Sequence, residues 1–446
     1  MHSHDGDPGS INAWVRVYEE DAVAAAAAAD ARRSAEGVRR DGPASALCGI
    51  PTGLKDLYAV AGKPLTASSR LLDEMPTQDS DVWARLRDAG MVLLGHLHTH
   101  EFAVGGTTDQ VGNPWSLDRS AGGSSGGSAA ALAARMVPAA TGTDTAGSLR
   151  IPSALCGTST IKPTRGLVSM AGVVPLGTTL DHAGPMARTL DDCALLLAAM
   201  AGPDRGRSES VFAGVPSVFP ERRSGPQPLL DVRLAVSPRL ATATLDPDVA
   251  DGFDLALDTC RRLGAAIADA PAPHVDLDLG ENFLDVVTAE LLVYHRRFDG
   301  RRELYRPALR EWVETGERRA LSAEAYVAAQ TRRRELTATW ADWFSKKQVS
   351  AVIEPTVPVV APLRGPGYDH AGTDFELISL THYWDWTGFP ALALPAGVGS
   401  RSHLPVSVSL IGPAGTEWEL LSIGSALQNE LGVPQPPGRG LELTSE

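Results

Sequence analysis

Residues 121–157 read AGGSSGGSAAALAARMVPAATGTDTAGSLRIPSALCG, and two blocks in this stretch place serine beside glycine. The first block covers 122–128 and the second covers 142–148. Glycine lets the backbone adopt unusual φ/ψ angles and approach a ligand closely. A serine on such a turn can face a substrate while neighbouring N–H groups bind a developing oxyanion. The stretch therefore predicts a serine nucleophile.

A serine nucleophile needs a base, and the sequence offers a lysine for this role. No GxSxG pattern surrounds Ser148, which argues against the nucleophile elbow of Ser/His/Asp hydrolases at this serine. Lys55 lies in the apolar segment GIPTGLKD at 49–56. Burial there would lower the pKa of its amine from about 10.4. A neutral lysine can take a proton from one serine, which takes a proton from the next.

The composition excludes several classes of partner. Hydrophobic residues make up 43% and charged residues 21% of the 446 residues, as in globular chains. The formal net charge of −14 repels phosphate backbones, so we expect no nucleic-acid partner. Cys48, Cys156, Cys193 and Cys260 lie far apart, which favours reduced thiols and a cytoplasmic protein. We expect no membrane association, because the alanine run at 24–29 is far shorter than the ~20 residues of a span.

Strand and helix patterns alternate along the chain, which predicts an α/β fold with a mixed twisted sheet covered by α-helices on both sides. We expect strands at 91–97, 232–236, 349–354 and 404–411. We expect helices at 11–33, 129–135, 189–200, 247–263 and 416–431, and charged helices within 281–346. The charged stretch 296–334 is expected to form a solvated helical face, which is favoured over the alternative that it covers the pocket.

These motifs also have other interpretations. The glycine/serine block alone would suit a flexible loop, and a phosphate-binding loop would need the absent GxxxxGK[ST] pattern. Three histidines occupy alternate positions, His96, His98 and His100. Alternate side chains of a strand share a face, so the three could bind a metal ion, but structural roles are favoured over a metal site.

The sequence resembles the amidase signature family of serine hydrolases. GIPTGLKD, the glycine/serine block and GTDTAGS followed by RIP occur in the family's order and at its spacing. Further matches are NPW at 113–115, KPTRG at 162–166, DHAGPMAR at 181–188, EPTVP at 354–358 and TGFPAL at 387–392. The resemblance covers about 11–431. It implies one amidase signature domain at 11–446, and residues 1–10 before it are expected to be disordered.

The resemblance implies a role for each matching residue. Ser148 would be the nucleophile, Ser124 would follow a cis peptide bond and relay the proton, and Lys55 would be the base. The predicted oxyanion hole consists of the backbone N–H groups of Thr145, Ala146, Gly147 and Ser148. Ser125 would join the hydrogen-bond network, and no metal or cofactor is needed. Ala146 replaces a glycine that is common in the family, so it must occupy an ordinary backbone region.

Side chains around the triad have two interpretations each. Arg150 could bind a substrate carboxylate, but we expect it to pair with Asp144 and brace the turn. Tyr383, Trp384 and Trp386 could form the aromatic wall of a substrate pocket. Packing in the core is equally compatible with these three aromatic residues.

The predicted function is hydrolysis of the carbon–nitrogen bond of a small-molecule amide through an acyl-enzyme. The first alternative is the glutaminase-type subunit of a tRNA-dependent amidotransferase, which works with partner subunits. Carbamate, urea-type or ester substrates form a second alternative, and a scaffold protein without catalysis a third. Homodimers are common among similar proteins, so a homodimer is one expected assembly.

Overall fold

The structure, a computed structural model, describes most of the chain. The described residues are 9–35, 46–204, 223–268, 270, 271, 273, 275, 279–364 and 374–437. Of the predicted disordered segment 1–10, residues 1–8 lie outside the described residues. Gly9 and Ser10 are described, and the Ser10 carbonyl oxygen lies close to Gly112.

The described residues form an 11-stranded mixed sheet, which confirms the predicted fold class. Parallel pairs join β2 to β3 and β6, and β9 to β10 and β11, while the other pairs are antiparallel. The order is β1 (Trp14–Val17), β3 (Val92–Leu97), β2 (Pro51–Lys55), β6 (Ala139–Asp144), β8 (His182–Ala187), β7 (Ser159–Lys162), β12 (Ala391–Val398), β13 (Pro405–Ile411), β11 (Ala351–Pro355), β9 (Arg233–Val236) and β10 (Ala266–Ala268). A separate hairpin joins β4 (Gly112–Asn113) and β5 (Ser116–Ser120).

Helices bury both faces of the sheet, and successive residues of a strand enter different cores because their side chains point to opposite faces. Ala139 belongs to the large core, whereas Ala140 packs with the smaller core beneath α4. One face is covered by α3 (Asp81–Asp88), α6 (Leu190–Met200), α7 (Pro247–Arg262) and α13 (Glu417–Leu431). The other face is covered by α4 (Gly126–Ala133) and α5 (Arg150–Cys156).

The predicted helix at 11–33 is wrong at its start. Trp14–Val17 forms β1, which pairs antiparallel with β3, and helix α1 covers Glu19–Ala35. Aromatic and β-branched residues suit a half-buried strand, so pairing with β3 outweighs the helical preference of the following alanines. Three acidic residues occupy the first turn of α1, where they stabilise the positive end of the helix dipole.

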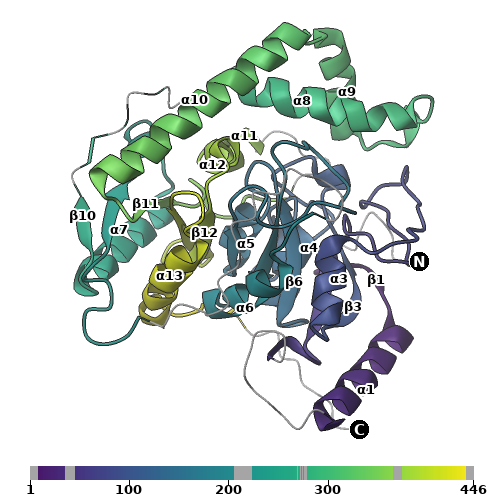
Figure 1. The fold of residues 1–446 in the computed structure, drawn as a ribbon, viewed down its shortest axis with the longest axis horizontal. Coiled ribbons are helices and arrows are strands. Elements are labelled where there is room, and N and C mark those ends of the chain that lie inside the picture. The colour runs from purple at the N-terminus through teal and green to yellow at the C-terminus, as the bar shows by residue number, and fades with distance from the viewer. Residues whose placement is uncertain are drawn as a thin grey trace.

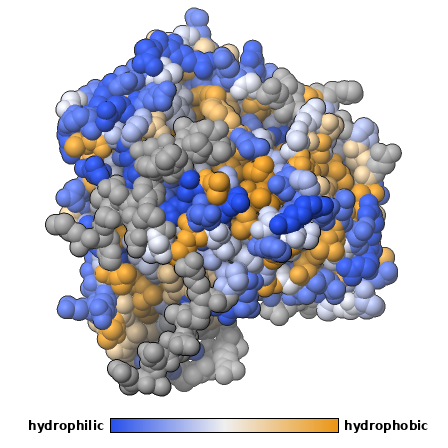
Figure 2. All heavy atoms as spheres, turned by 180° about the vertical axis from the view of Figure 1, so that it is seen from behind, coloured by the Kyte–Doolittle hydropathy of each residue, from blue (hydrophilic) through white to orange (hydrophobic). Residues whose placement is uncertain are grey.

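Three helices form an outer layer beyond the sheet and its covering helices (Figure 1). They are α8 (Glu281–His295), α9 (Pro307–Arg319) and α10 (Ala323–Lys347), as predicted for the charged stretch. Hydrophilic side chains dominate this end of the molecule, at the top of Figure 2. Two short helices, α11 (Asp374–Ile378) and α12 (His382–Thr387), lie between α10 and the sheet (Figure 1). Among the described residues, no helix is both long enough and apolar enough to cross a membrane.

Candidate active site

Lys55 is the last residue of β2, and its side chain is completely buried. Since β2 runs parallel to β6, Lys55 lies beside the strand that leads to the second serine block. Its Nζ atom donates to Ser124 Oγ at 2.7 Å, Ser125 Oγ at 2.9 Å and Thr143 Oγ1 at 2.9 Å. The structure therefore brings the candidate base into direct contact with Ser124 and Ser125, two of the three serines in the first block.

Burial lowers the pKa of Lys55 to about 7, although the carboxylates of Asp144 and Asp181 favour its charged form. A desolvated ammonium is costly, and hydroxyl groups compensate only part of that cost. The neutral amine is therefore well populated near pH 7, where it can accept a proton.

The first serine block forms a turn that enters α4. The peptide bond between Gly123 and Ser124 is cis, and Ser125 is the N-cap residue of α4. A side chain at Gly123 would lie 2.2 Å from the Thr107 carbonyl oxygen, so only glycine fits there. The Ser124 carbonyl oxygen accepts hydrogen bonds from the His100 N–H and the Thr108 hydroxyl. These contacts direct Ser124 Oγ towards Lys55.

Ser148 lies on the loop between β6 and α5, and it lines a cavity of about 370 Å³. Gly147 has a φ of 133°, and a side chain there would lie 2.2 Å from Thr381 Oγ1. Both the conformation and the close approach require glycine at this position. Ala146 is not among the residues with positive φ, as its side chain demands.

One member of the predicted oxyanion hole has another hydrogen-bond partner. The Gly147 N–H donates to Asp144 Oδ1, so it is committed to the interior of the loop. This corrects the expectation that all four N–H groups of 145–148 bind the oxyanion. The N–H groups of Thr145, Ala146 and Ser148 have no hydrogen-bond partner among the described residues. These three remain candidates for the oxyanion hole.

Arg150 braces this loop from inside the protein, in agreement with the favoured interpretation. Its Nε donates to Asp144 Oδ2 at 2.9 Å and its Nη2 to Asp144 Oδ1 at 3.1 Å. Nη2 also donates to Asp385 of α12 at 2.5 Å. Burial alone would raise the pKa of Asp144, but Arg150 holds it well below its usual range. Burial and the neighbouring Asp144 raise the pKa of Asp385.

We expect Arg150→Met to lower the free energy of unfolding by about 3–5 kcal/mol, because it leaves the buried Asp144 carboxylate without its cation. Chemical denaturation measures this loss. The control is Arg401→Met, which removes a mostly exposed arginine paired with Asp248 and Asp251, and which should destabilise the protein far less. Equal effects of the two substitutions would contradict the bracing role.

The cavity beside Ser148 has mostly apolar walls. Aromatic rings come from Phe283 of α8, Trp312 of α9 and Phe375 of α11. Glu311 and Arg319 are exposed at the cavity. The other lining residues are Ala103, Val104, Gly105, Gly106, Thr145, Ala146, Leu176, Leu284, Val287, Thr288, Ala308, Thr315, Gly316 and Ile378. Such walls favour an apolar group next to the reacting carbonyl.

The aromatic residues predicted to line the pocket lie elsewhere. Tyr383, Trp384 and Trp386 are fully buried, and none of them lines the cavity beside Ser148. The Tyr383 hydroxyl accepts from Trp340 Nε1 at 2.8 Å, and Trp384 Nε1 donates to Glu354 Oε1 at 2.6 Å. The structure thus places them in the core, the second of the two interpretations. The wall of the cavity beside Ser148 includes Phe283 and Val287. These two apolar residues lie one helical turn apart, and this spacing was the only sequence pattern that pointed to them.

The alternating histidines bond to core residues. His96 Nδ1 lies 2.7 Å from the Tyr18 hydroxyl, and His96 Nε2 lies 3.0 Å from the Tyr58 carbonyl oxygen. His98 Nδ1 lies 3.2 Å from Ser68 Oγ. Within the described part of the chain, no group of three histidine, cysteine or acidic side chains is arranged to hold a metal ion.

The chain belongs to the Amidase family, the amidase signature enzymes, which it matches over residues 8–421. It is accordingly an enzyme that acts on carbon–nitrogen amide bonds. This confirms the resemblance found in the sequence.

Named relatives and solved structures extend the comparison. A glutamyl-tRNA(Gln) amidotransferase subunit from Myxococcus xanthus is 36% identical, with 95% of this chain and 90% of that protein covered. A chain of a vestigial protein complex linked to the origins of an s-triazine catabolic enzyme matches with a TM-score of 0.84 and 29% identity, covering 96% of this chain and 93% of that one. A peptide amidase from Stenotrophomonas maltophilia matches with a TM-score of 0.77 and 28% identity, covering 96% and 91%.

Proposed function

We propose that this enzyme cleaves amides through a Ser148–Ser124–Lys55 relay. The observation that carries the proposal is the 2.7 Å contact between the buried Lys55 amine and Ser124 Oγ, in a site whose cavity Ser148 lines. Ser148 Oγ attacks the carbonyl carbon as its proton passes to Ser124, whose own proton passes to Lys55. The departing nitrogen takes a proton back through the same relay.

The remaining steps use the loop that carries Ser148. In both tetrahedral intermediates the negative oxygen is bound by backbone N–H groups of Thr145, Ala146 and Ser148. Water then attacks the acyl-enzyme as its proton passes to Ser124 and on to Lys55. The bond between the acyl carbon and Ser148 Oγ breaks, the proton returns through Ser124 to Ser148, and the acid is released. Ser125 and Thr143 accept the other hydrogen bonds of Lys55 and hold its amine in place.

The cavity favours a small-molecule amide with an apolar or aryl acyl group. A zwitterionic amino acid such as glutamine would lose its hydration against these aromatic walls, where, among the described residues, only Glu311 and Arg319 offer charged partners. Carbamate, urea-type and ester analogues with the same acyl group present the same carbonyl to Ser148, so they stay candidate substrates. The only partner this function needs is the substrate.

The names of the curated relatives favour a second function over the first. The Myxococcus protein is a subunit of a glutamyl-tRNA(Gln) amidotransferase. By this analogy, the chain would release ammonia from glutamine and would need partner subunits. Ammonia release by the purified chain, measured with phenylacetamide and with L-glutamine, separates the two functions. Turnover of phenylacetamide alone supports the first, and turnover of glutamine that rises with added partners supports the second.

Trp312→Ala tests the acyl pocket. We expect kcat/KM for phenylacetamide to fall about 10- to 100-fold, and that for acetamide to change less than about threefold, because only the aryl group fills the space beside the indole. Steady-state kinetics on both amides measure the ratio. The control Trp418→Ala removes a partly buried tryptophan from α13, outside the cavity. A proportional loss on both amides from Trp312→Ala would contradict this pocket assignment.

The pH dependence of kcat/KM follows from the pKa of Lys55, which is about 7. The protonated amine cannot accept a proton, so activity should rise about tenfold per pH unit below pH 7 and level off above it. Initial rates between pH 5 and 9 measure the profile. A rate that declines as the pH rises through 7 would contradict a lysine base.

A reduced, cytoplasmic environment remains our expectation for this enzyme. Cys48, Cys156, Cys193 and Cys260 are buried and free, and burial raises the thiol pKa of Cys260 to about 12. Thiols of this kind are unreactive. A homodimer also stays a prediction, which sedimentation of the purified chain would test.

A further inference from the structure

Asp181 lies directly before β8 and contacts the loop that carries the nucleophile. Its carboxylate is buried and accepts three hydrogen bonds. One comes from Thr145 Oγ1 at 2.6 Å, and the others come from the N–H groups of Leu176 at 2.9 Å and Gly177 at 3.1 Å. A buried carboxylate is costly unless donors compensate it, so these three bonds fix its position. Its position in turn fixes Thr145.

The next residue supports the same loop from a second point. His182 pairs with Asp144 across β8 and β6, and its Nδ1 lies 3.3 Å from the Asp144 carbonyl oxygen. Asp181 and His182 thus hold two consecutive loop residues, Asp144 and Thr145. The Thr145 N–H is one of the three candidate oxyanion donors, and Leu176 lines the cavity beside Ser148. One carboxylate therefore connects the oxyanion loop to a wall of the substrate cavity.

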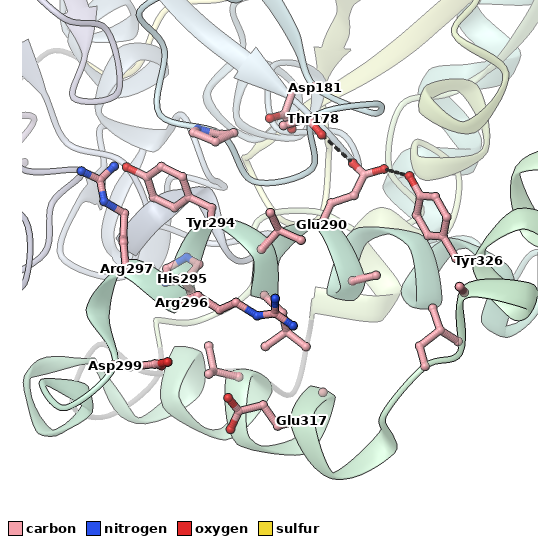
Figure 3. A pocket seen from close by; sticks show the side chains of 18 of the residues that line it. Thr178, Asp181, Glu290, Tyr294, His295, Arg296, Arg297, Asp299, Glu317 and Tyr326 are labelled. Atoms are coloured by element: carbon pink, nitrogen blue, oxygen red, sulfur yellow. Dashed lines mark hydrogen bonds between the residues drawn. The ribbon is translucent and has the colours of Figure 1, made fainter.

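Figure 3 shows how the loop before Asp181 is anchored to the outer helices. Glu290 of α8 accepts from the Thr179 N–H at 2.8 Å and from the Thr178 hydroxyl at 3.4 Å. The Tyr326 hydroxyl of α10 donates to the same carboxylate at 2.7 Å. Thr178, Glu290 and Tyr326 line a second cavity of about 1360 Å³. The helix that supplies Phe283 to the substrate cavity is therefore tied to the loop that Asp181 organises.

We propose that Asp181 is a positioning residue that aims the Thr145 N–H at the oxyanion through its hydrogen bond to the Thr145 hydroxyl. The proposal rests on the function proposed above. Asp181 would act on the transition state and the tetrahedral intermediates, because the oxyanion is absent from the bound substrate. Loss of the contact should therefore lower kcat and leave KM nearly unchanged.

The experiment compares Asp181→Asn, Thr145→Val, Thr145→Ser and the double variant Asp181→Asn/Thr145→Val, with phenylacetamide as substrate. Each of the first two should lower kcat about 10- to 100-fold, less than the ~10²–10³ of deleting an oxyanion donor outright. KM should stay within about threefold, because ground-state binding does not use the oxyanion hole. Thr145→Ser keeps the hydroxyl and should restore most of the activity.

Two readouts separate positioning from general damage to the fold. At pH 9, where Lys55 is neutral with or without the Asp181 charge, the double variant should be no slower than the slower single variant, because both substitutions disrupt the same contact between Thr145 and Asp181. Benzylboronic acid, which forms a tetrahedral anion on a serine, should bind more weakly by the same factor as kcat/KM falls. The matched control is Asp248→Asn, a buried carboxylate of α7 that accepts from the Arg401 and Ser402 N–H groups and should leave kcat unchanged.

Multiplied losses in the double variant, a loss confined to KM, or wild-type kcat in both single variants would overturn the role of Asp181. Where Asp181→Asn does not fold, Thr145→Val and Thr145→Ser decide alone. Ser148→Ala separates this failure from failure of the proposed function. An inactive Ser148→Ala beside a fully active Thr145→Val would refute only the positioning role, whereas an active Ser148→Ala would refute the mechanism itself.

Discussion

Replacing Ser148 with alanine should lower kcat by about 10⁵- to 10⁶-fold, the range seen when a serine hydrolase loses its nucleophile. The loss is this large because no acyl-enzyme can form, so the relay has no hydroxyl to activate. Ser148 is nearly buried and lines the cavity, so its removal changes little else in the fold. The measurement is single-substrate kinetics under saturating amide.

Ser128→Ala is the matched control for this substitution. Ser128 is another buried serine of the glycine/serine block, and its hydroxyl donates to the Thr141 carbonyl oxygen at 2.8 Å. This bond lies outside the relay, so its loss should change kcat by less than about tenfold. A Ser148→Ala variant that keeps more than about 1% of the wild-type kcat would contradict the nucleophile assignment.

Replacing Lys55 with methionine should lower kcat by about 10³- to 10⁴-fold, at the upper end for a general base. Ser124 then has no base to receive its proton. The residual activity should also lose its rise below pH 7, since that rise comes from titration of the Lys55 amine. Initial rates between pH 5 and 9, with thermal unfolding to check the fold, measure both effects.

Lys162→Met provides the comparison for Lys55. Lys162 is also buried, and burial lowers its pKa to about 8. Its Nζ donates to the carbonyl oxygens of Phe389 at 2.6 Å and Pro163 at 3.2 Å, and it takes no part in the relay. We expect Lys162→Met to cost stability but to lower kcat less than about tenfold. Equal losses of kcat in the two variants would contradict the role of Lys55 as the base, because removal of any buried lysine would then lower kcat.

The sequence was most informative where function depends on nearby residues. Gly123 and Gly147 cannot carry side chains where they lie, and the serines beside them follow in fixed order along the chain. The alternation of strands and helices likewise predicted the sheet. Even short segments show the side-chain period of two residues in a strand and of 3.6 residues in a helix. Arg150 could be paired with Asp144 from six residues away.

The cavity beside Ser148 could not be predicted from the sequence, because α8, α9 and α11 build it from residues far apart in the chain. An aromatic residue looks the same in a sequence whether it packs in the core or lines a pocket. The core contains Tyr383, Trp384 and Trp386. The cavity is lined instead by Trp312, which the sequence analysis did not single out because it lies in a charged helical stretch. The direction of the Gly147 N–H depends on the Asp144 carboxylate, which only the folded loop reveals.

The central claim is that Ser148 is the activated nucleophile. We would treat the purified protein with a fluorophosphonate probe, record its intact mass and map the modified peptide. The account predicts one adduct, on Ser148, absent from Ser148→Ala and formed much more slowly in Lys55→Met. An adduct on another residue, or none on a folded protein that hydrolyses amides, would contradict it.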